Sequence, residues 1–542
     1  MANGAAAEAR PALDVLIRGG WVADGTGNPL YPADVAVRGD RIVELGHLPA
    51  EATATLVIDA RGKIVCPGFV DVHSHSDRSI HANPTAESTI RQGITTELVG
   101  NCGSSYAPTA GPARGGPPDG SAPPGEGAPG LGFGAYLDGL EAMGISPNLG
   151  SFVGHNTVRR AAGVSGVAVS AGQRDAMRRP VREAMEAGAL GLSTGLEFDP
   201  GRLATMDEIV DLARVAGAAR GYYASHIRNR DAALQEAVDE CLEVGRRAGT
   251  PVQVSHLNVR HNTGAAPGAW QRAADTVERA RRDGLDAMAD MTPFREGTGS
   301  LRAILPPWFV AQGAQRAPEL LADPAVRARL RGECDRYWRF IHRGEWHRVR
   351  VMSSAAFPEV NGKSFAEIAA LWEQDPWDCY FDLLAAAGPG PGSLSAMAQL
   401  FTEEHLAEVI SHPLFSLAVD GWTSRIDGPL GERSRHPLNF AGMVHYLTHH
   451  VRQKGTLRLE EAIRKMTSLP ATRFELDGRG LLRAGAYADV VVFDYQELAD
   501  GSTIEQPLAY CRGVEHVLVN GTAVVADGEH TGARPGRALR RR

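Results

Sequence analysis

The stretch FVDVHSH, residues 69–75, is a short apolar run that ends directly in two histidines. Seven further apolar runs of similar length follow it along the chain, and most are separated by segments with helical periodicity. Alternating strands and helices predict a parallel sheet, and eight such strands predict a closed (β/α)₈ TIM-like barrel. The seven further runs are ITTELVG (94–100), NLGSFVG (148–154), GALGLST (188–194), GYYASH (221–226), PVQVSH (251–256), DAMADM (286–291) and FSLAVDG (415–421).

Both ends of the chain show a different pattern, in which short β segments are separated by Gly and Asp-Gly turns. The dipeptide Asn520-Gly521 is the favoured signal for a two-residue hairpin. We expect the two ends to form one small β-sandwich. The predicted domains are the N-terminal part of the sandwich at 1–65, the barrel at 66–475 and the C-terminal part of the sandwich at 476–542.

One more strand candidate, VRVMSS at 349–354, exceeds the eight that a barrel needs and is assigned to an insertion. Residues 294–350 carry a charged helical run without strand periodicity, so we expect an inserted lid there. The stretch 108–130 is rich in Pro and Gly with little to bury, which predicts an exposed loop.

The composition excludes several classes of protein. The chain has 542 residues, 43% of them hydrophobic, and a formal net charge of −8, which argues against nucleic acid as a partner. No apolar run approaches a membrane span or a secretory signal, so we expect no membrane association and a cytoplasmic location. The six cysteines are scattered and do not suggest a disulfide framework. The sequence makes no prediction of the oligomeric state.

Polar side chains able to bind a metal stand where the predicted strands end, and in a barrel that rim carries the active site. His73 and His75 lie two residues apart, so on extended chain they point to the same side. A single His-x-His pair is weak evidence, but the coincidence of seven such residues favours a site over packing alone. The seven are His73, His75, Cys102, His155, His226, His256 and Asp420.

Imidazole and thiolate groups favour Zn²⁺, whereas the oxygen-only ligand sets of Mg²⁺ and Ca²⁺ are absent. A catalytic zinc lowers the pKa of a bound water from 15.7 to about 7. Asp420 could then act as the general base and acid. Metal-assisted hydrolysis of an amide is therefore the expected reaction. We expect His155 either to contact the substrate or to support a metal-binding side chain from behind. The alternative is a purely structural hydrogen bond.

Several segments resemble the N-acyl-D-amino-acid deacylase (D-aminoacylase) branch of the metal-dependent amidohydrolase superfamily, over nearly the whole chain. They include PGFVDVHSHSD, VGNCG, ALGLSTGLEFDPG, YYASHIR, VQVSHL and RKMTSLPA. The resemblance implies a tight zinc site at Cys102, His226 and His256 and a second, weaker site at His73 and His75. It also implies that Asp420 is the catalytic acid and base.

The sequence departs from the pattern of this branch where the substrate binds. Asn258 stands where the branch usually has a Lys that binds the substrate carboxylate, and Thr292 stands at a Tyr that polarises the scissile carbonyl. Leu438 and Phe440 replace an Arg and a Tyr, and Arg230 stands where an acidic residue is common.

We therefore predict an amide substrate whose carboxylate is blocked or missing. The competing interpretation is that another cation takes over the carboxylate, with Arg228, Arg260, Arg295 and Arg425 as candidates. The candidate substrate-binding residues are His155, Asn258, Thr292, Arg260 and Arg425. Two further functions stay open, namely cyclisation or ring opening of a cyclic amide, and metal binding with little catalysis.

Overall fold

The computed structural model describes residues 13–109, 130–299, 301–310, 312–334, 338–387 and 394–541. The Pro/Gly-rich stretch predicted to be a loop therefore lies almost entirely outside the described residues.

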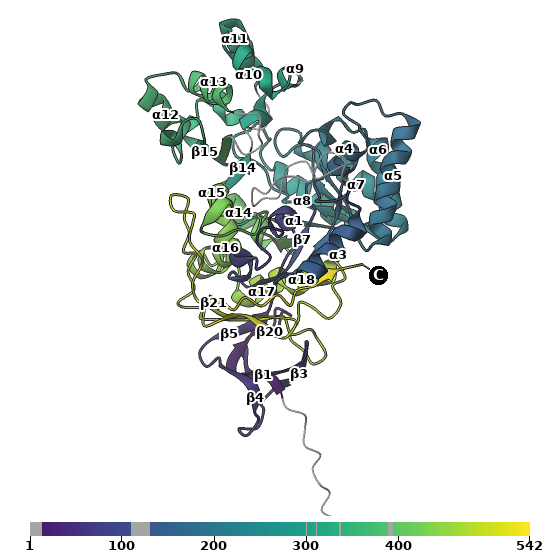
Figure 1. The fold of residues 1–542 in the computed structure, drawn as a ribbon, viewed down its shortest axis with the longest axis vertical. Helices are drawn as coiled ribbons and strands as arrows, with labels where there is room; N and C mark the ends of the chain where they lie inside the picture. Colours follow the sequence, from purple (N-terminus) through teal and green to yellow (C-terminus); the bar gives the residue numbers. More distant parts are fainter. Residues whose placement is uncertain are drawn as a thin grey trace, which may run out of the picture.

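Eight parallel strand positions form the barrel, which confirms the predicted fold class (Figure 1). The third position is interrupted at Phe152, so it consists of two short strands. A parallel bridge between Ser74 and Gly421 joins the first position to the last and closes the barrel. Every predicted apolar run contains one of these strands. The strands are β6 (Phe69–Asp71), β7 (Ile94–Val99), β8 (Asn148–Ser151), β9 (Val153–Gly154), β10 (Gly191–Gly195), β11 (Tyr222–His226), β12 (Val252–Val254), β13 (Ala287–Met291) and β17 (Phe415–Leu417).

Helices cover the outside of the barrel, and three of them, α5, α6 and α14, begin at a capping side chain. Ser170 accepts a hydrogen bond from Gln173 in a capping box, and Thr205 caps the next helix. Their apolar faces pack on the strands and hold the strand ends in register. These helices are α1 (Ser76–Ser79), α2 (Glu87–Ile90), α3 (Phe133–Met143), α4 (His155–Ala161), α5 (Ala171–Glu186), α6 (Met206–Ala218), α7 (Leu234–Ala248), α8 (Ala269–Arg282), α14 (Glu403–Ser411), α15 (Gly428–Arg433), α16 (Leu438–His445), α17 (Leu459–Met466) and α18 (Ser468–Arg473), with a π-helix at Tyr446–Gln453.

The β-domain is built from both ends of the chain and lies at the lower end of Figure 1. Its strands form one continuous nine-stranded sheet around a core of its own, which includes Val35 and Val490. The last strand, β22 (Ala538–Leu539), leaves this domain and pairs with β8 of the barrel. The strands of the sheet are β1 (Leu13–Val22), β2 (Tyr31–Arg38), β3 (Arg41–Gly46), β4 (Ala54–Asp59), β5 (Ile64–Pro67), β18 (Val490–Phe493), β19 (Val514–Val519), β20 (Thr522–Ala526) and β21 (Glu529–His530).

A long insertion between β13 and β17 rises above the barrel at the upper end of Figure 1. It contains the predicted segment 294–350 but continues to about residue 400, and it has an antiparallel sheet of its own. The candidate strand VRVMSS is the edge strand β15 of that sheet. The insertion comprises β14 (Glu296–Gly299), α9 (Pro307–Val310), α10 (Ala317–Leu321), α11 (Pro324–Glu333), β15 (Val349–Ser354), α12 (Phe365–Trp372), α13 (Pro376–Ala386) and β16 (Leu394–Gln399).

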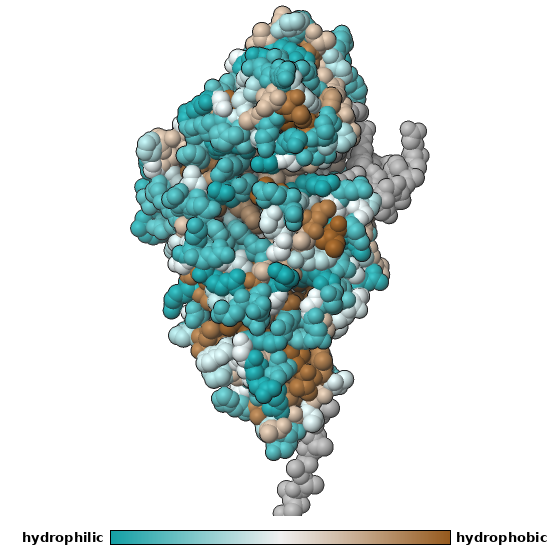
Figure 2. Space-filling view, turned by 90° about the vertical axis from the view of Figure 1, so that its left-hand side faces the viewer, coloured by the Kyte–Doolittle hydropathy of each residue, from teal (hydrophilic) through white to brown (hydrophobic). Residues whose placement is uncertain are grey.

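Most of the surface seen in Figure 2 is hydrophilic, and the apolar residues on that face form separate patches. Within the described residues, no helix has the length and hydropathy that crossing a membrane requires. The large apolar side chains that remain exposed are dispersed over the β-domain, the barrel and the insertion: Trp21, Val43, Val57, Val167, Val310, Leu371 and Ile426.

Candidate active site

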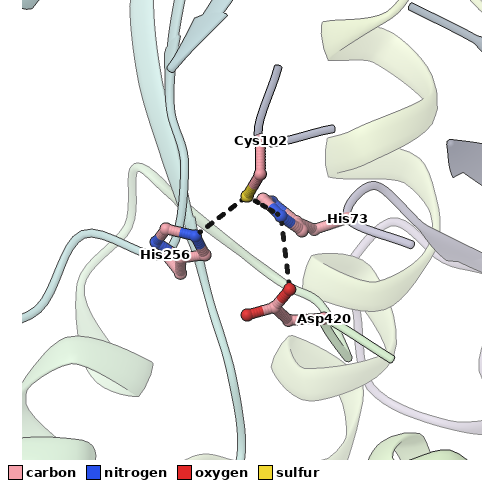
Figure 3. A group of neighbouring side chains, drawn as sticks. All are labelled: His73, Cys102, His256 and Asp420. Carbon is pink, nitrogen blue, oxygen red and sulfur yellow. Dashed lines mark hydrogen bonds and ion pairs between the residues drawn. The ribbon is translucent and has the colours of Figure 1, made fainter. Parts of the chain in front are cut away.

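Side chains from the carboxyl ends of five barrel strands meet at one mouth of the barrel. Four of them, His73, Cys102, His256 and Asp420, place one possible ligand atom each within 4.8 Å of the others (Figure 3). They follow β6, β7, β12 and β17, so residues nearly 350 positions apart in the chain become neighbours.

The thiol of Cys102 lies at the centre of the cluster. Its Sγ is 3.3 Å from Nε2 of His73 and 3.5 Å from both Nδ1 of His226 and Nε2 of His256. On the other side, Oδ1 of Asp420 is 3.4 Å from Nε2 of His73 and 3.0 Å from Nε2 of His75. All five residues predicted to bind metal thus surround one small volume together with the predicted acid and base.

The backbone is held in an unusual conformation at three of these residues. Cys102, His256 and Asp420 have φ values of 50°, 34° and 61°, a left-handed region that side chains with a Cβ rarely adopt. Such strain is concentrated at functional sites, because the surrounding structure must compensate for it.

Carboxylates outside the cluster orient the histidine rings. Oε2 of Glu197 lies 2.7 Å from Nε2 of His226, and Oδ1 of Asp290 lies 3.2 Å from Nδ1 of His73. Arg260 in turn donates to both oxygens of Glu197. A carboxylate behind a ring fixes the ring so that its other nitrogen faces the cluster, as in metal sites.

The charges in the cluster reinforce each other. Burial alone would raise the pKa of the Cys102 thiol, but the charges and hydrogen bonds of His73 and His226 hold it well below its ordinary value. Burial also opposes ionisation of Asp420, yet His73 and His75 lower its pKa to about 2. At neutral pH the site therefore presents a thiolate and a carboxylate.

His256 has a different partner from the other rings. Its Nδ1 accepts a hydrogen bond of 3.2 Å from Nη1 of Arg230, which also donates to Oδ1 of Asn258 at 3.2 Å. Burial and then the positive charge of Arg230 lower the pKa of His256 to about 4. This ring is therefore neutral at physiological pH.

A cavity of about 360 Å³ opens above the cluster. His75, Cys102, His226, His256 and Asp420 lie at its metal-binding side. Its remaining wall combines an apolar part, largely from the insertion and from the segments after β13 and β17, with polar and charged groups. These other lining residues are Ser104, Asn156, Arg160, Phe198, Asp199, Arg230, Thr292, Phe294, Glu296, Gly297, Thr298, Leu400, Phe401, Trp422 and Leu438.

The structure does not place every predicted substrate-binding residue at this cavity. Thr292 lines it, but Asn258 lies behind Arg230. His155 is fully buried against Glu208, with 2.8 Å between Nε2 and Oε1. Of the predicted residues, His155, Asn258, Arg260 and Arg425 are therefore absent from the lining.

Two of these absences from the lining have clear physical reasons. Arg260 is 1% exposed because it pairs with the carboxylates of Glu197 and Asp231. Arg425 faces solvent and pairs with Asp427. Conversely, sequence reasoning overlooked Glu197 and Asp290, although the first lies in the quoted segment ALGLSTGLEFDPG and the second ends DAMAD.

A second histidine group, His445, His449 and His450, lies behind the cavity wall. The ring of His445 stacks on Phe294 at 4.1 Å, and Nε2 of His450 lies 2.8 Å from the carbonyl oxygen of Pro293. These contacts support the segment after β13 that carries Thr292 and Phe294.

The donor set of the main cluster fits zinc. One thiolate and several imidazoles converge, and the outer ring nitrogens of His73 and His226 already face carboxylates. These are the ligand types and the supporting contacts that zinc sites use. Hard cations such as Mg²⁺ would require more oxygen ligands than this cluster offers.

The sequence matches the model of the Amidohydrolase family over residues 56–328 and 395–525, and the gap lies within the insertion. It is 36% identical to an N-acyl-D-glutamate deacylase of Alcaligenes xylosoxydans xylosoxydans over 98% of this chain and 97% of that protein. It is 32% identical to a D-aminoacylase of the same organism over 98% of each chain.

Solved structures agree with these similarities. An N-acyl-D-glutamate deacylase from Bordetella bronchiseptica, crystallised with zinc and a phosphonate inhibitor, aligns with a TM-score of 0.78 and 32% identity, over 98% of this chain and all of that one. An L-hydantoinase from Arthrobacter aurescens aligns over 98% of this chain and all of that one, with a TM-score of 0.56 and 16% identity, and shares the fold. The chain therefore belongs to the N-acyl-D-amino-acid deacylase branch of the amidohydrolase family.

Proposed function

We propose that this protein is a zinc-dependent hydrolase that removes the acyl group from an N-acyl-D-amino acid. The observation that carries the proposal is the convergence of the Cys102 thiol, the histidine rings and the Asp420 carboxylate below one cavity. The similarity to two deacylases over nearly the whole chain supports the reaction and the handedness of the substrate.

Cys102, His226 and His256 would hold the tightly bound zinc, and His73 and His75 would hold a second, weaker one. Zinc bound here would supply an activated water and polarise the scissile carbonyl. The preformed thiolate supports the tight site, because a zinc ligand has to be deprotonated.

Asp420 would move the proton. Its low pKa keeps the carboxylate ready to accept a proton at neutral pH, and Nε2 of His75 holds Oδ1 at 3.0 Å. After accepting the proton, Asp420 would return it to the leaving nitrogen, which needs a proton before the C–N bond breaks.

The insertion would act as a lid over the substrate. It contributes Thr298 and Leu400 to the cavity, and Phe401 follows it directly. Excluding water from a closed site strengthens the electrostatic interactions within it. The apolar side chains there are suited to a small apolar acyl group.

The direct test is hydrolysis of N-acetyl-D-methionine by zinc-loaded protein, with N-acetyl-L-methionine and a small cyclic imide as comparisons. We expect turnover of the D-enantiomer and a clear preference over the other two. Faster opening of the imide, or no turnover of any compound with zinc bound, would contradict the proposal. The cytoplasmic location stays a prediction from the sequence.

A further inference from the structure

The cavity lining carries two guanidinium groups as well as the carboxylates of Asp199, Glu296 and Asp420. Within the described lining, the guanidinium groups belong to Arg160, which is exposed, and Arg230, which is 6% exposed. Arg230 follows β11 and lies next to the metal-binding side, where Nη1 contacts both His256 and Asn258. An anion at this depth would meet a buried guanidinium rather than a solvated one, and burial strengthens such an interaction.

The neighbouring carboxylates are held mainly by another arginine. Glu197 accepts two hydrogen bonds from Arg260 and also contacts His226, whereas its distance to Nη2 of Arg230 is 3.9 Å. Asp231 is likewise bound by Arg260, at 3.1 Å. Arg260 thus binds the carboxylates behind the histidine rings, whereas Arg230 lines the cavity.

Asn258, at the position where the branch usually has a lysine, lies beside the guanidinium of Arg230. Its side chain is fully buried, and its Oδ1 faces the guanidinium of Arg230 at 3.2 Å. Its Nδ2 has no hydrogen-bond acceptor among the described residues. This hydrogen bond therefore fixes the Asn258 amide and the Arg230 guanidinium relative to each other.

We propose that Arg230 binds the carboxylate of the substrate and that Asn258 positions its guanidinium. This inference rests on the proposed function and names the class of substrate, an N-acyl amino acid with a free carboxylate, in place of the blocked or missing carboxylate predicted from the sequence. It also accounts for the missing lysine at residue 258, because the positive charge that would bind the carboxylate is at residue 230 instead. A planar guanidinium can bind both oxygens of a carboxylate through two parallel hydrogen bonds, a fixed geometry that the ammonium of a lysine lacks.

The test compares two substrates that differ only in that charge, N-acetyl-D-methionine and N-acetyl-D-methioninamide. In Arg230→Gln we expect kcat/KM for the acid to fall by roughly 30-fold or more, in line with the loss of one partner of a buried charge pair. Because Arg230 also contacts His256, both substrates are measured on the zinc-loaded variant, and we expect kcat/KM for the amide to fall at least tenfold less than kcat/KM for the acid.

A rescue variant distinguishes the loss of carboxylate binding from a structural effect of removing Arg230. Arg230→Gln combined with Asn258→Lys places a cation at the same corner from the neighbouring strand, and we expect it to recover at least a tenfold preference for the acid. Arg246→Gln is the matched control, because Arg246 is an exposed residue on the outer helix α7.

Parallel loss of both activities in zinc-loaded Arg230→Gln would overturn the inference and leave Arg230 as a support for His256. Equal kcat/KM for acid and amide in the wild type would overturn the inference alone. Absence of turnover on both compounds with zinc bound would contradict the proposed function as well.

Discussion

Nε2 of His226 lies 2.7 Å from Oε2 of Glu197, and this contact joins the ends of two neighbouring barrel strands. Burial opposes the charge of Glu197, but Arg260 and His226 hold its pKa well below the usual value. The carboxylate therefore stays ionised and fixes the ring so that Nδ1 faces Cys102. A residue that touches neither substrate nor cavity thus determines the geometry of the metal cluster.

The first prediction concerns that carboxylate. Glu197→Gln keeps a hydrogen-bond acceptor but removes the charge, so we expect zinc affinity to fall about 10- to 100-fold. Competition with a chromophoric chelator measures it. Glu240→Gln is the control, because Glu240 pairs with Arg228 away from the cluster. Equal zinc affinity in the wild type and Glu197→Gln would show that this contact does not orient the ligand.

Arg260 should matter for stability rather than for substrate affinity. Its guanidinium is buried between Glu197 and Asp231, and Arg260→Gln leaves both carboxylates without their main partner. Breaking a buried ion pair in this way costs about 3 to 5 kcal/mol. We expect a lower Tm by calorimetry. An unchanged Tm with a raised KM would instead place Arg260 in the substrate site.

Lys465, which lies away from the metal cluster, should make the free energy of unfolding depend on pH. It is fully buried and donates to the carbonyl oxygens of Ile410 and His412, and burial lowers its pKa from 10.5 to about 7. Between pH 10.5 and 7 the unfolded chain binds this proton and the folded chain does not. Folding therefore loses up to about 1.36 kcal/mol for each pH unit of that fall.

Lys465→Met removes this penalty, so its Tm relative to the wild type should rise as the pH is lowered from 10 to 7. Differential scanning calorimetry at four pH values measures the difference. Lys454→Met, at an exposed position, is the control and should show a constant difference. A constant difference for Lys465→Met would contradict the assigned pKa.

The sequence predicted the barrel because its strands are apolar runs with buried side chains on both faces, and all eight positions were found. It missed the full length of the insertion, which continues beyond residue 350, because β16 (Leu394–Gln399) joins the insertion through its pairing with β14 and β15. Local patterns carry no information about such pairing.

The candidate site was predicted unevenly for a similar reason. His73, Cys102 and Asp420 end strands, so their positions follow from the fold. For Arg260 and His155, residue type and position do not tell whether the side chain faces the mouth or packs against a neighbour. The partners that decide this, Glu197 and Glu208, lie on other segments of the chain.

In the proposed reaction, Asp420 transfers the proton beside a metal ion that the cysteine and the histidines hold. The most direct test measures zinc content and turnover of N-acetyl-D-methionine together in Asp420→Asn. We predict zinc bound to the tight site at the wild-type ratio and a kcat reduced by about 10² to 10⁴, the contribution typical of general acid and base catalysis. Zinc bound as in the wild type together with a kcat close to that of the wild type would contradict the account.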